Sequence, residues 1–446
     1  MREVIELEGF EVLDNSRMTS THRGLFILSS MGLFLDGYDL SIITLAMLVI
    51  PAQLSLTLTE HVLVNVSSFV GMAIGAPLLG WFADRFGRKV VFGMDLILFV
   101  VFAILSGLSV NFYMLFVSRL LLGVGIGGDY PISSTMLSEF APVRNRGSLL
   151  IGMVGLYWVG SLMASAMNYA FAPFTDFWRY TFVIGGLMAI PIILLRLRIP
   201  ESPRWLVSRG RYREAEESIE RITGSRGLSI ANGRPQRSKL SEIMRGRYAL
   251  MAFFVFTAWF FFDVAAYGIG FYSPVILSEL GFDRHIRLIA EGGMIIAVGA
   301  IVGYVVAFGL AENIGRRYLT IVGFLVMTVL LFLGSFVRIS GPLKLIPFFF
   351  LFVLFEQWVG AVTLFYPAEL FPTSVRSTVQ GTSTAISRIG AIMGVVLFPY
   401  FSVFSSLEVF AFFSLVGLVI AIALAPETKR KSLEKIVQSM DVNAKL

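Results

Sequence analysis

Long apolar stretches alternate with short polar loops along most of the chain. A helix needs roughly 20 mostly apolar residues to cross a membrane, and twelve stretches of the chain meet this need. They cover residues 24–50, 62–82, 90–109, 112–139, 148–172, 178–197, 249–279, 289–311, 318–337, 345–368, 378–403 and 407–425. The pattern predicts an all-α membrane protein with twelve transmembrane helices in two pseudo-symmetric six-helix bundles.

These stretches divide the chain into five parts. We expect an N-terminal segment at 1–23, a six-helix bundle at 24–197, a linker at 198–248, a second six-helix bundle at 249–425 and a C-terminal tail at 426–446. Within the linker, the sequence RYREAEESIERI (211–222) places Tyr212, Ala215 and Ile219 on one side of a helix. This spacing predicts a short amphipathic helix, with a flexible linker as the alternative. Residues 224–242 are expected to form a mobile linker.

The distribution of Lys and Arg predicts how the chain sits in the membrane. The central linker and the loops on its side are rich in these residues, whereas the loops 51–61 and 404–408 have none. Loops rich in Lys and Arg usually lie in the cytoplasm. Both termini are therefore expected there, in a multi-pass protein of the plasma membrane. The polar first segment and the long first apolar run argue against a cleavable signal peptide.

Composition supports the membrane setting and argues against several kinds of function. The chain has 446 residues, of which 56% are hydrophobic and 15% charged, against about 25% charged residues in soluble domains. It has no Cys, and its three His lie near predicted helix ends, so no metal site and no cofactor are expected. The net charge of +6 comes from the loops and does not indicate nucleic-acid binding. The sequence contains no HExxH, GxSxG or Walker motif, which argues against an enzyme or an ATP-driven pump.

The two halves of the chain repeat each other's loop motifs. GWFADRFGRKV (80–90) is echoed by FGLAENIGRRY (308–318), SEFAPVRNRGS (138–148) by AELFPTSVRST (368–378), and PESPR (200–204) by PETKR (426–430). Secondary transporters built from two parallel six-helix units have this layout. The repeat also argues against a channel, which would favour a ring of polar groups with subunit symmetry.

The repeated motifs are candidates for a gate. An acid at a helix end can pair with Arg, or with a neighbouring helix terminus, in one conformational state and release it in the other. A simple bias of positive charge toward one side explains the basic residues of these motifs, but it explains neither the acids nor the glycines. The candidate gate residues are Asp84, Arg85, Gly87, Arg88, Arg119, Glu139, Arg146, Glu201, Arg204, Glu312, Arg316, Glu369 and Arg376.

The first predicted helix carries two acids. Ionisable residues inside membrane helices are costly and are functional candidates for that reason. Asp36 and Asp39 are three residues apart and therefore share a face. Two carboxylates on one buried face do not both ionise readily, so the pair is suited to hold a proton. The alternative is a structural acid paired with Arg119 or with the backbone.

Two further helices carry candidate chemistry. In the fourth predicted helix, Asp129 and Tyr130 follow the glycine-rich run GVGIGG. No β-strand precedes these glycines, so they indicate close helix packing rather than a dinucleotide site. In the seventh predicted helix, Trp259, Asp263 and Tyr267 are spaced four residues apart and form one polar stripe.

The chain resembles the major facilitator superfamily of transporters and, within it, the phosphate:proton symporter family. The second resemblance rests on GVGIGGDYPISSTMLSE in the fourth helix, on the polar stripe of the seventh helix and on DGYD in the first. It implies that Asp36, Asp39 and Asp129 belong to a proton path. It also implies that substrate contacts Tyr130, Trp259, Asp263 and Tyr267.

At two positions the chain departs from that family. Tyr157 stands where the family has a substrate-binding Gln, and Gly360 stands where it has a substrate-binding Asn. Glu356 and Gln357 lie one helical turn before Gly360, so they join Tyr157 as candidate substrate residues. Gate and loop stretches such as PESPRWLVSRGRYREAEE and GFYSP are similar to the sugar porter family.

Together these features predict a monomeric secondary active transporter. We expect proton-coupled symport of a small solute across the lipid bilayer by alternating access, with inorganic phosphate or a related small anion as the substrate. A sugar or sugar-acid:proton symporter of the sugar porter type is the alternative.

Overall fold

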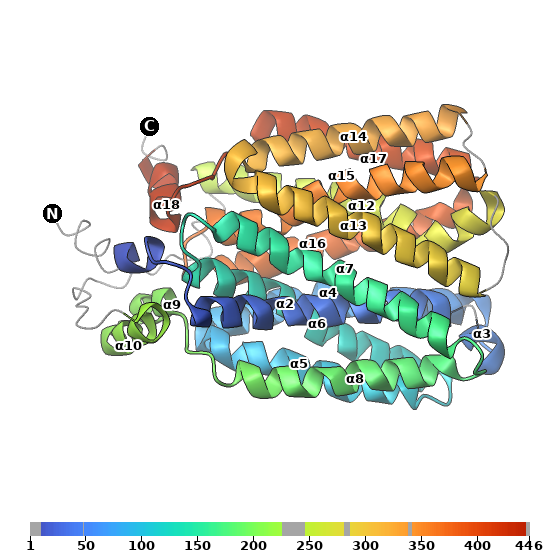
Figure 1. The fold of residues 1–446 in the computed structure, drawn as a ribbon, viewed down its shortest axis with the longest axis horizontal. Coiled ribbons are helices and arrows are strands. Elements are labelled where there is room, and N and C mark those ends of the chain that lie inside the picture. The colour runs from blue at the N-terminus through green and yellow to red at the C-terminus, as the bar shows by residue number, and fades with distance from the viewer. Residues whose placement is uncertain (1–9, 48, 225–245, 281–285, 338–340, 443–446) are drawn as a thin grey trace.

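A computed structural model describes residues 10–47, 49–224, 246–280, 286–337 and 341–442, and within these ranges the chain is all-α. Twelve long helices run side by side along the longest axis of the molecule (Figure 1). The first six are α2 (Ser20–Ala46), α4 (Leu58–Phe86), α5 (Arg88–Gly107), α6 (Phe112–Phe140), α7 (Arg146–Phe171) and α8 (Phe177–Arg196). The second six are α12 (Gly246–Leu280), α13 (Ile286–Ile314), α14 (Arg316–Val337), α15 (Pro342–Leu370), α16 (Arg376–Leu397) and α17 (Val403–Leu424). The predicted all-α fold with twelve helices is confirmed.

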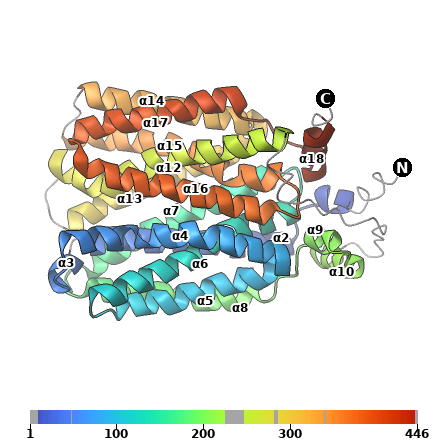
Figure 2. The same ribbon diagram turned by 180° about the vertical axis from the view of Figure 1, so that it is seen from behind.

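Short helices lie at the ends of the long ones. The segments α9 (Pro203–Ser208), α10 (Tyr212–Thr223) and α18 (Leu433–Val442) lie at the same end of the molecule as both chain termini (Figures 1 and 2). We call this the termini end. The predicted amphipathic helix is confirmed as α10, and it buries Ala215 and Ile219 in a cluster with Phe10 and Trp205. Residues 225–245, which include most of the expected linker 224–242, lie outside the described residues.

Helix boundaries differ from the prediction where capping or proline acts. The first helix begins at Ser20 rather than 24, because the Thr19 side chain accepts a hydrogen bond from the backbone N–H of His22 and caps the helix. It ends at Ala46, and the short helix α3 (Ile50–Gln53) follows at the opposite end. The helix predicted at 378–403 ends at Leu397, where Pro399 enters the 3-10 turn Phe398–Tyr400 and supplies no backbone N–H donor.

The outer faces of the bundle are suited to lipid. Eleven helices in the described part of the chain are long and apolar enough to cross a membrane. Large apolar side chains on the outer helices are exposed, among them Ile97, Leu194, Leu333 and Phe412. A continuous exposed apolar surface of this kind requires a non-aqueous partner. The chain is therefore a multi-pass membrane protein.

Among the twelve long helices, α16 is the one that is too polar to count as a membrane span by hydropathy. Its first turns read RSTVQGTSTAISR, and the Ser, Thr and Gln side chains of this stretch are mostly buried. They avoid lipid because α16 packs against α4 of the first half and α12 of the second. A helix enclosed by protein can be polar, and here hydroxyls donate hydrogen bonds to carbonyls of their own helix, as Ser383 does to Val379 and Thr384 to Gln380. The polarity of α16 thus follows from its place at the interface between the halves.

The same packing scheme occurs in both halves. The helix α2 packs on α7 and α8 as α12 packs on α16 and α17, and α5 packs on α6 and α8 as α14 packs on α15 and α17. The halves meet mainly where α4 packs on α16 and α7 packs on α13, with smaller contacts of α6 and α7 with α15 and of α6 with α16. Repeats related in this way are found in transporters whose two units move against each other.

Glycines bring α4 and α16 into backbone contact. A Cβ atom built on Gly381 would lie 2.1 Å from the carbonyl oxygen of Ala76, and one on Gly80 would lie 2.4 Å from that of Ser377. Small residues allow this approach between membrane helices. The two halves are therefore in close contact toward the termini end.

We predict that Gly381→Val separates α4 from α16 at the termini end, because a side chain cannot occupy the space held by the Ala76 backbone. Since the chain has no Cys, spin labels on Arg144→Cys and Lys435→Cys, two exposed positions at that end, would report the change by pulsed EPR as a larger population of long distances. Gly93→Val is the matched control, because nothing lies within 4 Å of a Cβ at Gly93. An unchanged distance distribution in folded Gly381→Val protein would contradict the prediction.

Candidate transport site and gate

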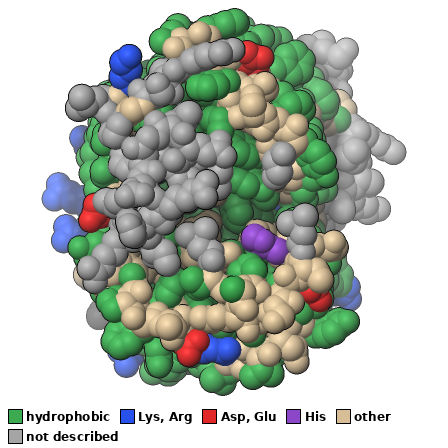
Figure 3. Space-filling view, turned by 90° about the vertical axis from the view of Figure 1, so that its right-hand side faces the viewer, with side chains coloured by type: hydrophobic (Ala, Val, Ile, Leu, Met, Phe, Trp, Pro, Cys, Tyr) green, Lys and Arg blue, Asp and Glu red, His purple; other side chains and the backbone are tan. Residues whose placement is uncertain are grey.

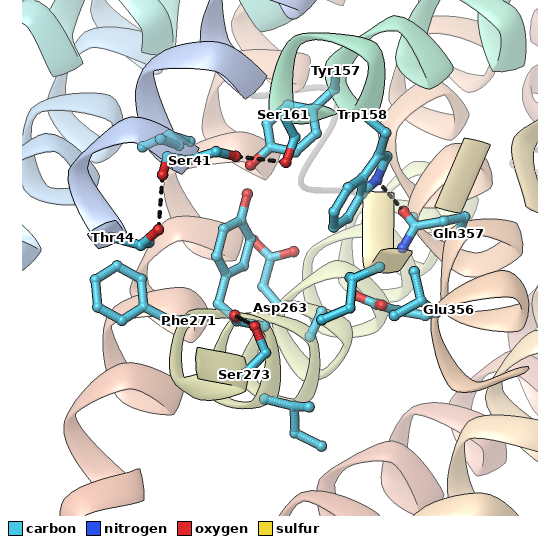
Figure 4. A pocket seen from close by; sticks show the side chains of 18 of the residues that line it. Ser41, Thr44, Tyr157, Trp158, Ser161, Asp263, Phe271, Ser273, Glu356 and Gln357 are labelled. Carbon is cyan, nitrogen blue, oxygen red and sulfur yellow. Dashed lines mark hydrogen bonds between the residues drawn. The ribbon is translucent and has the colours of Figure 1, made fainter. Parts of the chain in front are cut away.

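A cavity lies between the two halves. Its volume is about 180 Å³, below the roughly 300–1,000 Å³ typical of sites for drug-sized ligands. Helices of both halves line it, and Figure 4 shows side chains from opposite walls facing one another across it. The lining extends from Tyr130 in the interior of α6 to Thr44, near the end of α2 opposite the termini. The cavity is of a size for a small solute.

All seven candidate substrate residues line this cavity. The first half contributes Tyr130 and Tyr157, and the second half contributes Trp259, Asp263, Tyr267, Glu356 and Gln357. Gly360, the second departure from the phosphate symporter pattern, lines it as well. These positions are far apart along the chain, and the packing of α15 against α6, α7 and α12 brings them together. Their role in binding stays a prediction.

Arg388 on α16 adds a positive charge to the cavity wall. Its Nη2 atom lies 3.0 Å from Oδ2 of Asp263, and its Nη1 donates a hydrogen bond to the Tyr267 hydroxyl. Its guanidinium carbon lies 5.4 Å from the centre of the Tyr130 ring and 4.8 Å from that of Tyr267. Asp263 and Arg388 are both almost fully buried. The cavity therefore contains an ion pair that bridges α12 and α16.

A hydrogen bond across the halves forms another part of the wall. The Trp158 indole Nε1 donates to Oε1 of Gln357 at 2.7 Å, which joins α7 to α15 (Figure 4). Because indole N–H is a donor only, the acceptor must be the amide oxygen of Gln357. Its Nε2 then points away from Trp158 and has no hydrogen-bond partner among the described residues. A buried donor thus remains available in the cavity wall.

A second group of charges lies inside the first half. Nη1 of Arg196 lies 2.7 Å from Oδ1 of Asp129 and 3.4 Å from Oδ2 of Asp95. Asp36 interacts electrostatically with all three of these residues and is itself buried. A Cβ atom on Gly32 would lie 1.9 Å from Asp129 Oδ2, so glycine lets α2 approach the group. We call Asp36, Asp95, Asp129 and Arg196 the acid cluster.

Asp36 and Asp39 contact different partners, although the two carboxylates still interact electrostatically. Asp39 forms an ion pair of 2.7 Å with Arg119, as the alternative proposed. Asp36 instead faces the acid cluster. Residues three apart on a helix diverge by about 60° around its axis, and here that angle directs the two carboxylates to different partners. Arg119, grouped with the gate in the sequence, lies in α6 far from the termini end.

Charges at the termini end join the two halves. Glu139 at the end of α6 accepts contacts from Arg88 of its own half at 3.4 Å and from Arg376 of the other half at 2.9 Å. Asp84 accepts hydrogen bonds from the backbone N–H of Thr378 at 2.7 Å and of Ser377 at 3.3 Å. These donors belong to the first turn of α16, where a helix favours negative charge. We call the contacts of Asp84 and Glu139 with α16 the latch.

The repeated motifs fold alike in the two halves. Backbone N–H of Arg88 donates to Glu201 at 3.0 Å, and backbone N–H of Arg316 donates to Glu427 at 3.2 Å. Arg316 also pairs with Glu369 at 3.1 Å, the counterpart of Arg88 with Glu139. Burial raises the pKa of Glu201 above its usual range, an effect opposed by these hydrogen bonds.

Glycine is required where each of these acids approaches. Gly87 and Gly315 have φ values of 115° and 96°, a region that favours glycine. A Cβ atom on Gly87 would lie 2.3 Å from Glu201, and one on Gly315 would lie 2.2 Å from Glu427. The glycines of the motif therefore make room for Glu201 and Glu427, which accept hydrogen bonds from the first backbone N–H groups of the next helix. The side chain of Glu312 lies outside the described residues, and Arg85 is an exposed residue beside the Trp81 ring.

Asp14 is a contact that the sequence did not point to. Its Oδ1 lies 3.0 Å from Nη2 of Arg146 and 2.8 Å from Nη2 of Arg204. Arg204 also lies over the Phe10 ring, 5.0 Å from its centre. The N-terminal segment thereby ties α7 to α9 beside the latch. Asp14 stands in a polar terminal stretch without a motif, so no sequence signal marked it.

Two arginines of the interior were also missed as partners. Arg196 ends α8 in the sequence RLR and reads like an ordinary loop cation. Arg388 stands out as a charge inside a predicted helix, but its partner Asp263 is 125 residues away. Asp95 likewise stands out as an intramembrane acid without a sequence neighbour to pair with. The sequence thus marked Arg388 and Asp95 as charges inside predicted helices, but it did not indicate the partner of any of the three residues.

Comparison with known proteins decides the family. A family model for sugar and other transporters matches residues 25–439. The chain belongs to this family. It is therefore a transporter of the major facilitator superfamily, as its resemblance to the phosphate and sugar porter groups predicted.

Individual relatives cover nearly all of the transporter. It is 28% identical to the niacin transporter NiaP of Acinetobacter baylyi, over 95% of this chain and 98% of that protein. It is 29% identical to the putative inorganic phosphate transporter 1-13 of Oryza sativa, over 98% of this chain and 95% of that protein. The structure of the proton:xylose symporter XylE bound to 6-bromo-6-deoxy-D-glucose aligns with a TM-score of 0.82 and 22% identity, over 95% of this chain and all of the other, and confirms the fold.

We predict that Asp14→Ala lowers the free energy of unfolding of the transporter by about 3–5 kcal/mol, because it removes a carboxylate from two buried arginines. Thermal or chemical unfolding of the detergent-solubilised protein would measure the loss. Glu11→Ala removes an exposed acid from the same segment and should change stability by less than about 0.5 kcal/mol. Equal stability of the two variants would show that Asp14 does not hold the termini end together.

Proposed function

We propose that this transporter carries out proton-coupled symport of a small anion, the class that includes inorganic phosphate, by alternating access. The observation that carries the proposal is the Asp263–Arg388 ion pair in the wall of the cavity between the halves. A guanidinium buried in a membrane protein is costly, and in this position it is suited to bind an anion. We further propose that the transporter works as a monomer in the plasma membrane, with both termini in the cytoplasm.

The proposed orientation agrees with the distribution of charge on the surface. The end opposite the termini shows mostly hydrophobic or uncharged side chains among its described atoms, with Lys and Arg mainly at its edge (Figure 3). The gate motifs and α10 place many arginines at the termini end. Under this orientation the latch closes the cytoplasmic side, and the cavity faces outward.

The latch supports alternating access. Its contacts join the halves on one side only of the cavity, and they are polar contacts that water can replace once the side opens. Bound substrate would let the two halves rock about the cavity, break the latch and expose the site to the cytoplasm. The ion pairs Arg88–Glu139 and Arg316–Glu369 lie within single halves, so they would persist through that motion.

The acid cluster supports coupling to protons. Two carboxylates, Asp95 and Asp129, contact the guanidinium of Arg196 in the interior of the first half, and Asp36 interacts electrostatically with all three groups. One Arg compensates one negative charge, and additional buried carboxylates are strongly disfavoured unless they bind protons. We propose that Asp36 on α2 and Asp129 on α6 carry the coupled proton here. Asp39, which follows Asp36 on α2 and pairs with Arg119, is proposed to belong to the same proton path.

We predict that uptake into proteoliposomes driven by an inward proton gradient identifies the substrate class. Radiolabelled phosphate, galactonate and glucose would be compared with and without the gradient. Gradient-driven accumulation of an anion is the expected result. Accumulation of glucose alone would favour the sugar porter alternative, for which the hydrogen-bonding Gln357 and Glu356 in the cavity wall are the supporting observation.

We predict that Asp36→Asn lowers gradient-driven accumulation more than tenfold, because the variant cannot bind the coupled proton. It should retain substrate counterflow, because it can still change conformation with substrate bound. Asp176→Asn makes the same change at an exposed acid outside the cavity and should transport normally. Full accumulation by Asp36→Asn would exclude that residue from the proton path.

A further inference from the structure

We propose that the transported anion is a carboxylate monoanion with a flat apolar body, and that it binds by displacing Asp263 from Arg388. The proposal rests on the function proposed above, in that it takes the cavity to be the transport site. It goes further by assigning the chemical class of the substrate and the group that its charge replaces.

The charges in the cavity favour a monoanion. Among the residues that line it, Arg388 is the one Lys or Arg, and Asp263 and Glu356 are acids. Inorganic phosphate is partly a dianion near neutral pH, and a dianion carries more charge than one guanidinium beside two acids can compensate. A carboxylate carries a single charge, and its two oxygens match two parallel N–H groups of Arg.

The walls favour an apolar body. Eleven of the 31 lining residues are aromatic: Phe69, Tyr130, Tyr157, Trp158, Trp259, Phe262, Tyr267, Phe271, Tyr304, Phe349 and Phe352. Aromatic rings pack well against flat apolar surfaces. Five Ser and Thr hydroxyls also line the cavity, but the polar groups of a hexose or a phosphate that face the aromatic rings would lose their hydrogen bonds with water without replacement.

Gln357 supplies a polar contact away from Arg388. Its amide oxygen is taken by Trp158, and its Nε2 is a buried donor with no acceptor in the described part of the chain. An acceptor on the ring of the ligand, remote from its carboxylate, would satisfy this donor. The cavity thus provides an anion contact, an aromatic wall and a separate donor.

The ion pair links anion binding to a proton. Arg388 lies 3.0 Å from Oδ2 of Asp263 and is its counter-charge, whereas Ser387 and Trp259, its hydrogen-bonding neighbours, are neutral. When the ligand carboxylate takes that guanidinium, Asp263 is left as a buried acid without a counter-charge. A proton from water binds to Asp263 at that step, because an uncompensated buried carboxylate is strongly disfavoured. One anion and one proton then load together.

Other titratable groups face Asp263 from each helix around it. They are Arg388 on α16, Tyr267 on α12, Glu356 on α15, Tyr304 on α13, Tyr130 on α6 and Tyr157 on α7. Glu356 is the other acid of the set, so Glu356→Gln serves to separate its protonation from that of Asp263.

Calorimetry on the full-length purified transporter tests the ligand class, with benzoate, inorganic phosphate and benzyl alcohol as probes. We expect benzoate to bind at least tenfold more tightly than phosphate or the neutral alcohol. Arg388→Gln should weaken benzoate binding at least 100-fold, and Arg388→Lys, which keeps the charge but not the planar fork, about tenfold. Arg213→Gln, at an exposed position on α10, is the matched control. Tighter binding of phosphate, or benzoate binding that both Arg388 variants retain in full, would overturn the proposal.

Proton uptake on binding tests the displacement. In weakly buffered solution with a pH dye, the unmodified protein and Glu356→Gln should take up one proton per bound benzoate. Asp263→Asn should take up none, and it should bind benzoate at least tenfold more tightly at pH 8, because its Arg388 has no internal counter-ion. Unchanged proton uptake in Asp263→Asn would overturn the displacement.

Transport separates this inference from the proposed function. Gradient-driven accumulation of phosphate together with absence of benzoate binding would overturn the substrate class and leave proton-coupled anion symport intact. Failure of the proton gradient to drive any of the anions, with glucose accumulated instead, would overturn both.

Discussion

A charge inside a membrane protein must have a counter-charge, and the interior of this transporter is organised by that constraint. Arg119, Arg196 and Arg388 are buried inside the bundle, and each is paired: Arg119 with Asp39, Arg196 with Asp129, and Arg388 with Asp263. Removing one member of such a pair is strongly destabilising, because the other remains charged and buried. Under the proposed function, ligands and protons would therefore act on the structure by changing which charges are paired.

The same constraint gives the latch two possible states. Glu139 lies between Arg88 of its own half and Arg376 of the other half. The first contact keeps the acid compensated within its half, while the second holds the halves together. In the proposed transport cycle, opening of the termini end would expose Arg376 and its partner to water, where the loss of an ion pair has a small effect on free energy. A buried ion pair whose loss has little effect on the free energy once water reaches it is suited to a gate that opens repeatedly.

The repeat of the chain explains why the gate is built twice. Glu201 and Glu427 each accept hydrogen bonds from the start of the next helix, and a glycine with positive φ lies beneath each of them. The interior is not repeated in this way. The acid cluster lies in the first half, whereas the Asp263–Arg388 pair lies in the second. The frame is thus symmetric, and the chemistry is divided between the halves.

Local sequence was sufficient for the helices, their number and the gate motifs, because hydrophobic length and loop charge depend on neighbouring residues. It also marked Asp36, Asp39, Asp129 and Asp263, since an acid in an apolar run is visible without a structure. It could not pair them: Asp36 and Asp39 point to different partners, Arg196 resembled a loop residue, and Asp14 had no motif. Pairing depends on which helices pack together and how each is rotated, and contacts between residues more than a hundred positions apart set both. Only the tertiary structure could therefore show that Arg388 meets Asp263 in an aromatic cavity.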